Sequence, residues 1–185
     1  MFEKLIAKVA SSLKKYRIPY MIIGGQAVLL YGTPRLTRDI DITLGVSIDE
    51  FDAVKDAVKD AGLKIIPEKP EDFVRKTFVL PAEDEKLKIR VDLIFSFTPY
   101  ERGAIKRAKD KAISDVKVKF ASVEDIIIHK IFSGRARDLE DVRAIMVKNP
   151  DYDFSYVKKW LAEFDKASED KKFREIFKNI QRQIK

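Results

Sequence analysis

The sequence of 185 residues contains no cysteine and one histidine. Without thiols the chain has no disulfide, no thiolate metal site and no thiol nucleophile. His129 has no second histidine or cysteine with which to share a metal ion, so we expect it to be a packing or surface residue. Apolar runs are short, and none approaches the roughly 18–20 residues of a membrane-spanning helix. The N-terminal segment also lacks the unbroken apolar core of a secretory signal. We therefore expect a cytoplasmic protein with no membrane partner.

Charge, by contrast, is plentiful. The chain has 37 Lys and Arg against 30 Asp and Glu, which gives a formal net charge of +7. Such an excess favours a polyanionic partner, such as nucleic acid or the phosphates of a nucleotide. A basic but otherwise ordinary surface would give the same count. The length predicts one domain with a small helical appendage. We expect a core over residues 1–121 and a helical part over 122–185 that packs on it, as a single compact unit.

The chain is organised around the stretch MIIGGQAVLLYGTPRLTRDIDITL, from Met21 to Leu44. Its pattern predicts a strand, a tight turn, a short apolar helix, a loop and a second strand. Gly24 and Gly25 end the first strand and open the helix. Backbone N–H groups at a helix N-terminus bind anions, so this turn predicts a phosphate site.

The second predicted strand, over 39–44, carries Asp39 and Asp41 with one isoleucine between them. Residues two apart on a strand point to the same face, so both carboxylates share the polar face. They would repel each other unless a cation lies between them, and Mg²⁺ prefers such oxygen ligands. A solvated strand face, with the aspartates paired to Arg35 or Arg38, is the alternative. The same two arginines could instead contact a triphosphate.

A further carboxylate is expected from a β-hairpin with strands over 73–80 and 86–95, joined by a loop over 81–85. In its second strand, Asp92 lies on the polar face together with Arg90. If this strand is a neighbour of the strand over 39–44, three carboxylates converge on one face of the sheet. The alternative is an edge-strand aspartate that is paired with Arg90.

Together these features resemble the DNA polymerase β-like nucleotidyltransferase superfamily. The resemblance rests on the two glycines, the short helix and the Asp-x-Asp strand, in which Asp39 follows Gly25 by fourteen residues. It covers roughly residues 20–95, and the third carboxylate of the family comes from a sequence similar to the Val-Asp-Leu-Ile around Asp92. The chain departs from the family at Gln26, where a serine or threonine often stands.

The segment HKIFSGRARDLEDV resembles the Lys…Arg-x-Lys-Asp-x-x-Asp element of the AbiEii-type branch of these enzymes, with Arg137 where a lysine often stands. This resemblance implies that Lys130 and Asp138 bind or position the nucleotide. The residues themselves allow a structural interpretation. Lys130 lies near an apolar stripe and should have a partner, either Asp138 or Asp141, and Asp138 could be a helix N-cap.

The other segments are interpreted as packing elements. We expect helices over 2–16, 47–61, 100–113, 122–132, 139–146, 153–165 and 168–184, and strands over 20–23, 63–66 and 116–120. These elements predict an α/β fold of the α+β type: a small mixed sheet with flanking helices and a helical C-terminal part.

The resemblance implies a nucleotidyltransferase that uses a nucleoside triphosphate and two Mg²⁺ ions, with Mn²⁺ as a substitute. Asp39, Asp41 and Asp92 would be the catalytic residues and the metal ligands, and Asp92 would accept the proton of the attacking hydroxyl. Gly24, Gly25 and Arg38 would bind the nucleotide.

The acceptor could be RNA, a protein hydroxyl or a small molecule, and the basic charge tilts the expectation toward RNA. Two alternatives stay open at this point. The first is a catalytically silent member of the fold that binds a nucleotide or nucleic acid. The second is one component of a toxin–antitoxin pair, with a protein partner or as a homodimer.

Overall fold

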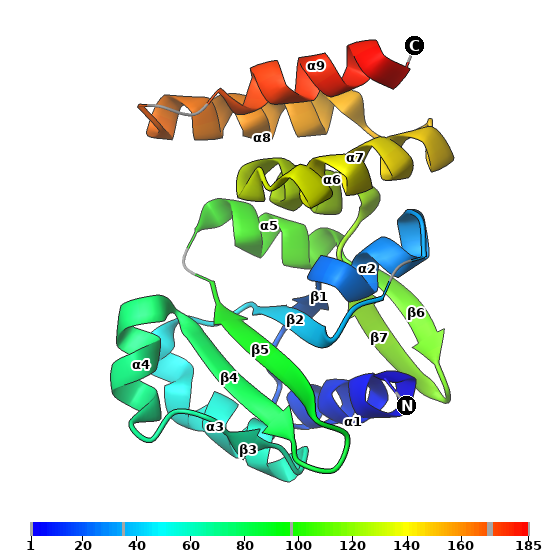
Figure 1. The fold of residues 1–185 in the computed structure, drawn as a ribbon. Coiled ribbons are helices and arrows are strands. Elements are labelled where there is room, and N and C mark those ends of the chain that lie inside the picture. The colour runs from blue at the N-terminus through cyan, green and yellow to red at the C-terminus, as the bar shows by residue number, and fades with distance from the viewer. Residues whose placement is uncertain (1, 35, 97, 170–171, 185) are drawn as a thin grey trace. The chain divides into compact units, whose positions relative to one another are not determined.

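The computed structural model describes residues 2–34, 36–96, 98–169 and 172–184. The chain divides into two compact units. Unit 1 comprises Met1–Gln26 and Leu36–Ala121, and unit 2 comprises Ala27–Arg35 and Ser122–Lys185. Each unit has buried apolar side chains of its own. Helix α2 (Gly24–Tyr31) begins in unit 1 and ends in unit 2 (Figure 1).

Unit 1 is built on a mixed sheet whose described strands follow the order β3-β4-β5-β2-β1-β7-β6 (Figure 1). The strands are β1 (Tyr20–Ile22), β2 (Asp39–Leu44), β3 (Lys64–Ile65), β4 (Val79–Asp84), β5 (Ile89–Phe95), β6 (Lys109–Ile113) and β7 (Val116–Phe120). β2 pairs with β5, and β1 with β7, in parallel, whereas the other neighbours pair antiparallel. The predicted mixed sheet with flanking helices is confirmed.

The helices of unit 1 are α1 (Phe2–Lys15), the short 3₁₀ helix η1 (Ile48–Glu50), α3 (Phe51–Asp60), α4 (Pro70–Thr77) and α5 (Pro99–Arg107). Helix α1 packs against β7 and α3, because its apolar residues recur at helical spacing and form one buried stripe. Ser12 on α1 donates a hydrogen bond of 2.7 Å to the carbonyl oxygen of Ala57 on α3.

The two central strands follow the predicted alternation. On β2, Ile40, Ile42 and Leu44 are at most 1% exposed, and they form the core face. The apolar residues of β5 from Ile89 to Phe95 are buried in the same alternating way. The opposite face of each strand is therefore the one that carries the aspartates.

The predicted strand over 73–80 is wrong, because its first part belongs to helix α4. Pro70 occupies the first turn of α4, where its missing N–H and fixed φ cost nothing. Glu71 accepts hydrogen bonds from Arg75 one turn later, and Phe78 ends the helix in the left-handed conformation with a φ of 58°. The apolar residues of this segment suggested a strand, but its start and stop signals are those of a helix.

The predicted helix over 100–113 is wrong in its second half. Helix α5 ends at Arg107, and residues 109–113 form β6, which pairs antiparallel with β7. β6 is an edge strand, and nearly all of its side chains are exposed and many are charged. Because such a strand buries neither face, it has no alternating apolar pattern to reveal it.

Unit 2 is helical in its described part. It contains α6 (Val123–Ser133), α7 (Ala136–Lys148), α8 (Phe154–Ala167) and α9 (Phe173–Ile184), as well as most of α2. Asn149, which follows α7, donates a hydrogen bond of 2.8 Å to the carbonyl oxygen of Tyr31 at the end of α2. Among the described residues, no helix is both long and apolar enough to cross a membrane.

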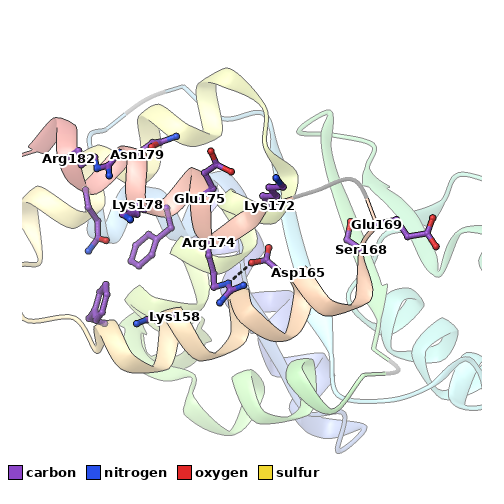
Figure 2. Close-up of a pocket in the computed structure, with 13 residues that line it drawn as sticks. Lys158, Asp165, Ser168, Glu169, Lys172, Arg174, Glu175, Lys178, Asn179 and Arg182 are labelled. Carbon is purple, nitrogen blue, oxygen red and sulfur yellow. Dashed lines mark hydrogen bonds and ion pairs between the residues drawn. The ribbon is translucent and has the colours of Figure 1, made fainter.

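A pocket of about 850 Å³ lies along α8 and α9 within unit 2 (Figure 2). Its walls carry charges of both signs. The basic side chains are Lys158, Lys172, Arg174, Lys178 and Arg182, and the acidic ones are Asp165, Glu169 and Glu175. Arg174 is paired with Asp165 at 2.6 Å, so part of the positive charge is neutralised within the pocket.

Candidate active site

The predicted carboxylates lie on one face of two adjacent parallel strands. In the register of β2 and β5, Asp41 lies opposite Asp92, and Asp39 lies opposite Arg90. Paired residues on neighbouring strands are about 4.8 Å apart and share a face. The two strands are thus neighbours, which the sequence left as a condition, and the catalytic role of the three aspartates stays a prediction.

Gly24 and Gly25 bring the start of α2 against these carboxylates. Gly24 has a φ of +62°, and a Cβ atom there would lie 1.9 Å from Oδ2 of Asp41. A Cβ atom at Gly25 would lie 2.4 Å from Oγ1 of Thr37. Both positions therefore require glycine for close approach, and Gly24 requires it for conformation as well. The Asp41 carboxylate lies beside the backbone at the N-terminus of a helix.

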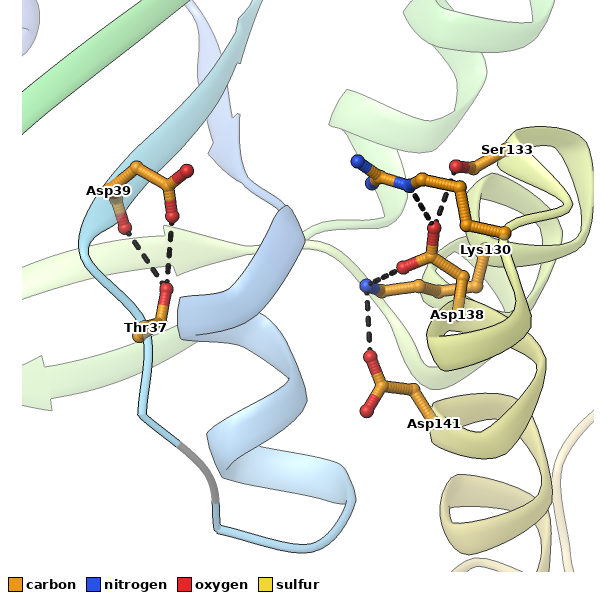
Figure 3. Close-up of polar contacts among 7 residues, drawn as sticks. Thr37, Asp39, Lys130, Ser133, Asp138 and Asp141 are labelled. Carbon is orange, nitrogen blue, oxygen red and sulfur yellow. Dashed lines mark hydrogen bonds and ion pairs between the residues drawn. The ribbon is translucent and has the colours of Figure 1, made fainter.

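Thr37 and Gln26 both contact Asp39 at the start of β2. The sequence did not reveal these two contacts. Thr37 donates a hydrogen bond of 3.1 Å to Oδ1 of Asp39, as Figure 3 shows. Gln26 is 7% exposed, and its Nε2 lies 3.5 Å from the carbonyl oxygen of Asp39. Gln26 thus lies against the backbone at the start of β2. Arg38 is exposed beside Asp39, and Arg35 lies outside the described residues.

Asp92 makes an ion pair with the residue two positions before it. Nε of Arg90 lies 2.8 Å from Oδ1 of Asp92, and the side chains are 54% and 18% exposed, respectively. The sequence offered this pair as the alternative to a metal site. Among the described residues, no three side chains of His, Cys, Asp or Glu are gathered closely enough to hold a metal ion. In their chemistry, the carboxylate oxygens that Asp39, Asp41 and Asp92 offer on one sheet face are the ligands that a hard cation prefers.

In unit 2, Lys130 is the centre of a buried ionic cluster (Figure 3). Its Nζ lies 2.5 Å from Oδ1 of Asp138 and 3.0 Å from Oδ2 of Asp141, and all three side chains are less than 10% exposed. Ser133 and Arg135 also donate to Oδ2 of Asp138, at 2.7 and 2.6 Å. The expected partner of Lys130 is therefore confirmed. The interpretation of Asp138 as an N-cap is wrong, because Arg135 occupies that position of α7.

These contacts set the protonation of Asp138. Burial by itself raises the pKa of this carboxyl group, but the hydrogen bonds from Lys130, Ser133 and Arg135 outweigh it and lower the pKa to about 2. The group is thus an anion over the whole physiological range. The cluster stabilises the start of α7 against the end of α6.

Solved structures with the same fold are nucleotidyltransferases. The structure of ANT(2'')-Ia with adenylyl-2''-tobramycin has a TM-score of 0.61 and 18% identity, and the match covers 89% of this chain and 97% of that one. An antigenic nucleotidyltransferase-like protein from Paracoccidioides brasiliensis has a TM-score of 0.55 and 21% identity, over 80% of this chain and 75% of that one.

The lincosamide antibiotic adenylyltransferase LnuA, with lincomycin bound, has a TM-score of 0.52 and 17% identity, over 77% of this chain and 94% of that one. At these identities the likeness defines the fold. No curated protein sequence matches the chain significantly. The fold is thus that of the nucleotidyltransferases, as the resemblance predicted. The family described as "Nucleotidyl transferase AbiEii toxin, Type IV TA system" matches residues 10–184, and the chain belongs to this family.

Proposed function

We propose that the protein transfers a nucleoside monophosphate from a nucleoside triphosphate to an acceptor hydroxyl, with a divalent metal and with release of pyrophosphate. The observation that carries the proposal is the register of β2 and β5, which sets Asp41 opposite Asp92. The close approach of Asp41 to Gly24 supports it further, because it puts a carboxylate next to a helix N-terminus suited to phosphate.

The triphosphate would bind through the backbone N–H groups at Gly24 and Gly25, with the exposed Arg38 near its charge. The assignment of Lys130 and Asp138 to the nucleotide rests on the sequence resemblance. The ion pair between them supports a second role, which is to stabilise unit 2.

Asp39, Asp41 and Asp92 would hold Mg²⁺ or Mn²⁺. When bound, the metal lowers the pKa of the acceptor hydroxyl and stabilises the charge that develops on the entering and leaving oxygens. In the transfer, the acceptor oxygen bonds to the α-phosphorus and the bond from that phosphorus to the pyrophosphate oxygen breaks. Asp92 accepts the proton of the hydroxyl.

RNA is the acceptor that we propose. The net charge of +7 favours a polyanion, and Lys and Arg contacts to phosphates supply most of the sequence-independent affinity for nucleic acid. The exposed basic side chains along α8 and α9 other than the paired Arg174 are available for such contacts. A small-molecule acceptor is the competing candidate, favoured by the fold shared with ANT(2'')-Ia, whose structure contains adenylyl-2''-tobramycin.

The test is transfer of label from each α-³²P nucleoside triphosphate into total RNA, into protein and into aminoglycosides, with Mg²⁺ or Mn²⁺. An Asp39→Asn/Asp41→Asn double variant is the inactive control. Asp52→Asn is the matched control, because it removes an exposed carboxylate on α3 that lies outside the site. Label in RNA with wild type and Asp52→Asn alone supports the proposal. Label in protein or in the aminoglycoside would refute RNA as the acceptor. The absence of label from every fraction would refute nucleotidyl transfer itself.

A further inference from the structure

Arg90 lies among carboxylates in the sheet. Across three neighbouring strands, Arg90 on β5 is in register with Asp39 on β2 and with Glu83 on β4. Two residues further along β5, on the same face, Asp92 is in register with Asp41. Arg90 therefore has a carboxylate in register on each side and Asp92 two residues further along its own face, while Glu83 also lies 3.5 Å from Nζ of Lys88.

The guanidinium is directed at one of these carboxylates. Its Nε lies 2.8 Å from Oδ1 of Asp92, which is the less exposed partner at 18%. An exposed ion pair contributes little to stability by itself. This one has a second effect, because Asp41 lies directly opposite Asp92 and two like charges side by side on a sheet destabilise it. Arg90 offsets that repulsion from within the site.

We propose that Arg90 is a counter-ion of Asp92 in the candidate active site and competes with the divalent metal for this carboxylate. The inference rests on the proposed function, in which Asp92 is a metal ligand. While Arg90 holds Asp92, it offsets the charge of this carboxylate. A metal ion that binds Asp92 displaces the guanidinium, so Arg90 sets the metal concentration at which the site fills.

The competition predicts opposite effects on the metal-free and the metal-bound protein. Loss of the Arg90 charge breaks the ion pair of Asp92, so the metal-free protein loses stability. The same loss removes the competitor for Asp92, so the metal binds more tightly. Replacement of a surface arginine without this role would change neither the stability of the metal-free protein nor its affinity for the metal.

The test is direct binding of Mn²⁺, measured as free Mn²⁺ by electron paramagnetic resonance, on the full chain. Wild type is compared with Arg90→Gln and Arg90→Lys. The matched control is Arg75→Gln, since Arg75 makes a comparable ion pair on α4 and its side chain is 59% exposed, against 54% for Arg90. Both glutamine variants lose the same charge, so a general electrostatic effect appears in both.

We expect Arg90→Gln to bind Mn²⁺ about tenfold more tightly than wild type, which corresponds to about 1.4 kcal/mol. Arg75→Gln should bind as wild type does. Arg90→Lys keeps the charge without the guanidinium and should fall between wild type and Arg90→Gln. Mn²⁺ should also raise the melting temperature of Arg90→Gln more than that of wild type.

Equal affinities of Arg90→Gln and Arg75→Gln, with binding to wild type that Asp41→Asn abolishes, would overturn the role of Arg90 and leave the metal site intact. If wild type binds no Mn²⁺, with or without a nucleoside triphosphate, the metal-dependent function fails as well. If Arg90→Gln does not fold, the Mn²⁺ affinity of Arg90→Lys is the test. An affinity of Arg90→Lys equal to that of wild type would overturn the inference.

Discussion

The carboxylate of Asp41 fills the space that a side chain at position 24 would need, since a Cβ atom on Gly24 would lie 1.9 Å from its Oδ2. This contact joins the two halves of the sequence motif, the paired glycines and the Asp-x-Asp strand. It explains why the turn requires glycine, and it fixes where the Asp41 side chain lies relative to the start of α2. The position of the Asp41 side chain therefore depends on the absence of a side chain at Gly24.

Gly24→Ala should destabilise the protein by roughly 2 kcal/mol or more, because it combines a strained left-handed conformation with overpacking. It should also weaken Mn²⁺ binding, because Asp41 must move. Chemical denaturation and Mn²⁺ titration measure the two effects. Gly103→Ala on α5 is the control, since a Cβ atom there meets nothing within 4 Å, and it should stabilise the helix slightly. Equal stabilities of the two variants would contradict the role given to Gly24.

Asp41→Asn should abolish function without loss of the fold. Under the proposed function it removes a metal ligand, and the rate of nucleotidyl transfer should fall by roughly 100-fold or more. The metal-free protein should be as stable as wild type or more stable, because the charge that opposes Asp92 is gone. Parallel melting curves and label-transfer rates measure both quantities. A variant that melts far below wild type would show that Asp41 is a structural residue instead.

The central site was the more predictable part of the molecule. Alternation with a period of two placed Asp39, Asp41 and Asp92 on polar strand faces, and the pairing of β2 with β5 agrees with it. The partner of Lys130 was predictable for a similar reason, because a lysine on an apolar stripe needs a buried carboxylate. Both inferences use a local period that burial enforces.

The remainder depends on contacts that a local pattern does not encode. Thr37 lies close to Gly25, and no spacing in the sequence indicates this approach. The edge strand β6 is held by backbone pairing with β7, so its charged side chains resembled a solvated helix. Helix α4 shows a different failure, since Pro70 and the Glu71–Arg75 pair were readable signals that the apolar residues masked.

Stability should fall in acid through Asp138. Its pKa is about 2 in the folded protein and 3.8 in the reference state. A lowered folded-state pKa contributes stability above the unfolded value, and this contribution is lost as the pH falls from about 4 to about 2. The shift corresponds to about 2 kcal/mol. The difference in unfolding free energy between wild type and Asp138→Asn should therefore shrink over that range.

Urea denaturation of both proteins between pH 6 and about pH 2 measures this difference. Ser133→Ala is the companion variant, because it removes one donor to Asp138 and leaves the carboxylate in place. It should raise the pKa of Asp138 and shift the loss of stability to higher pH. A difference between wild type and Asp138→Asn that stays constant across the range would refute the assignment.

Membership of a toxin family predicts an effect in cells. If toxicity requires transfer, expression of the protein should arrest growth and Asp39→Ala should abolish the arrest. The reason is that Asp39 lies exposed at the start of β2 and is held by Thr37, so its loss removes a proposed ligand and leaves the core intact. Asp52→Ala, at a carboxylate whose side chain is 84% exposed on α3, should arrest growth as wild type does. Immunoblots at equal induction control for expression. Arrest that survives in Asp39→Ala would mean that toxicity comes from binding, and the sheet face that carries Asp39 would then have to be tested for a binding partner rather than for turnover.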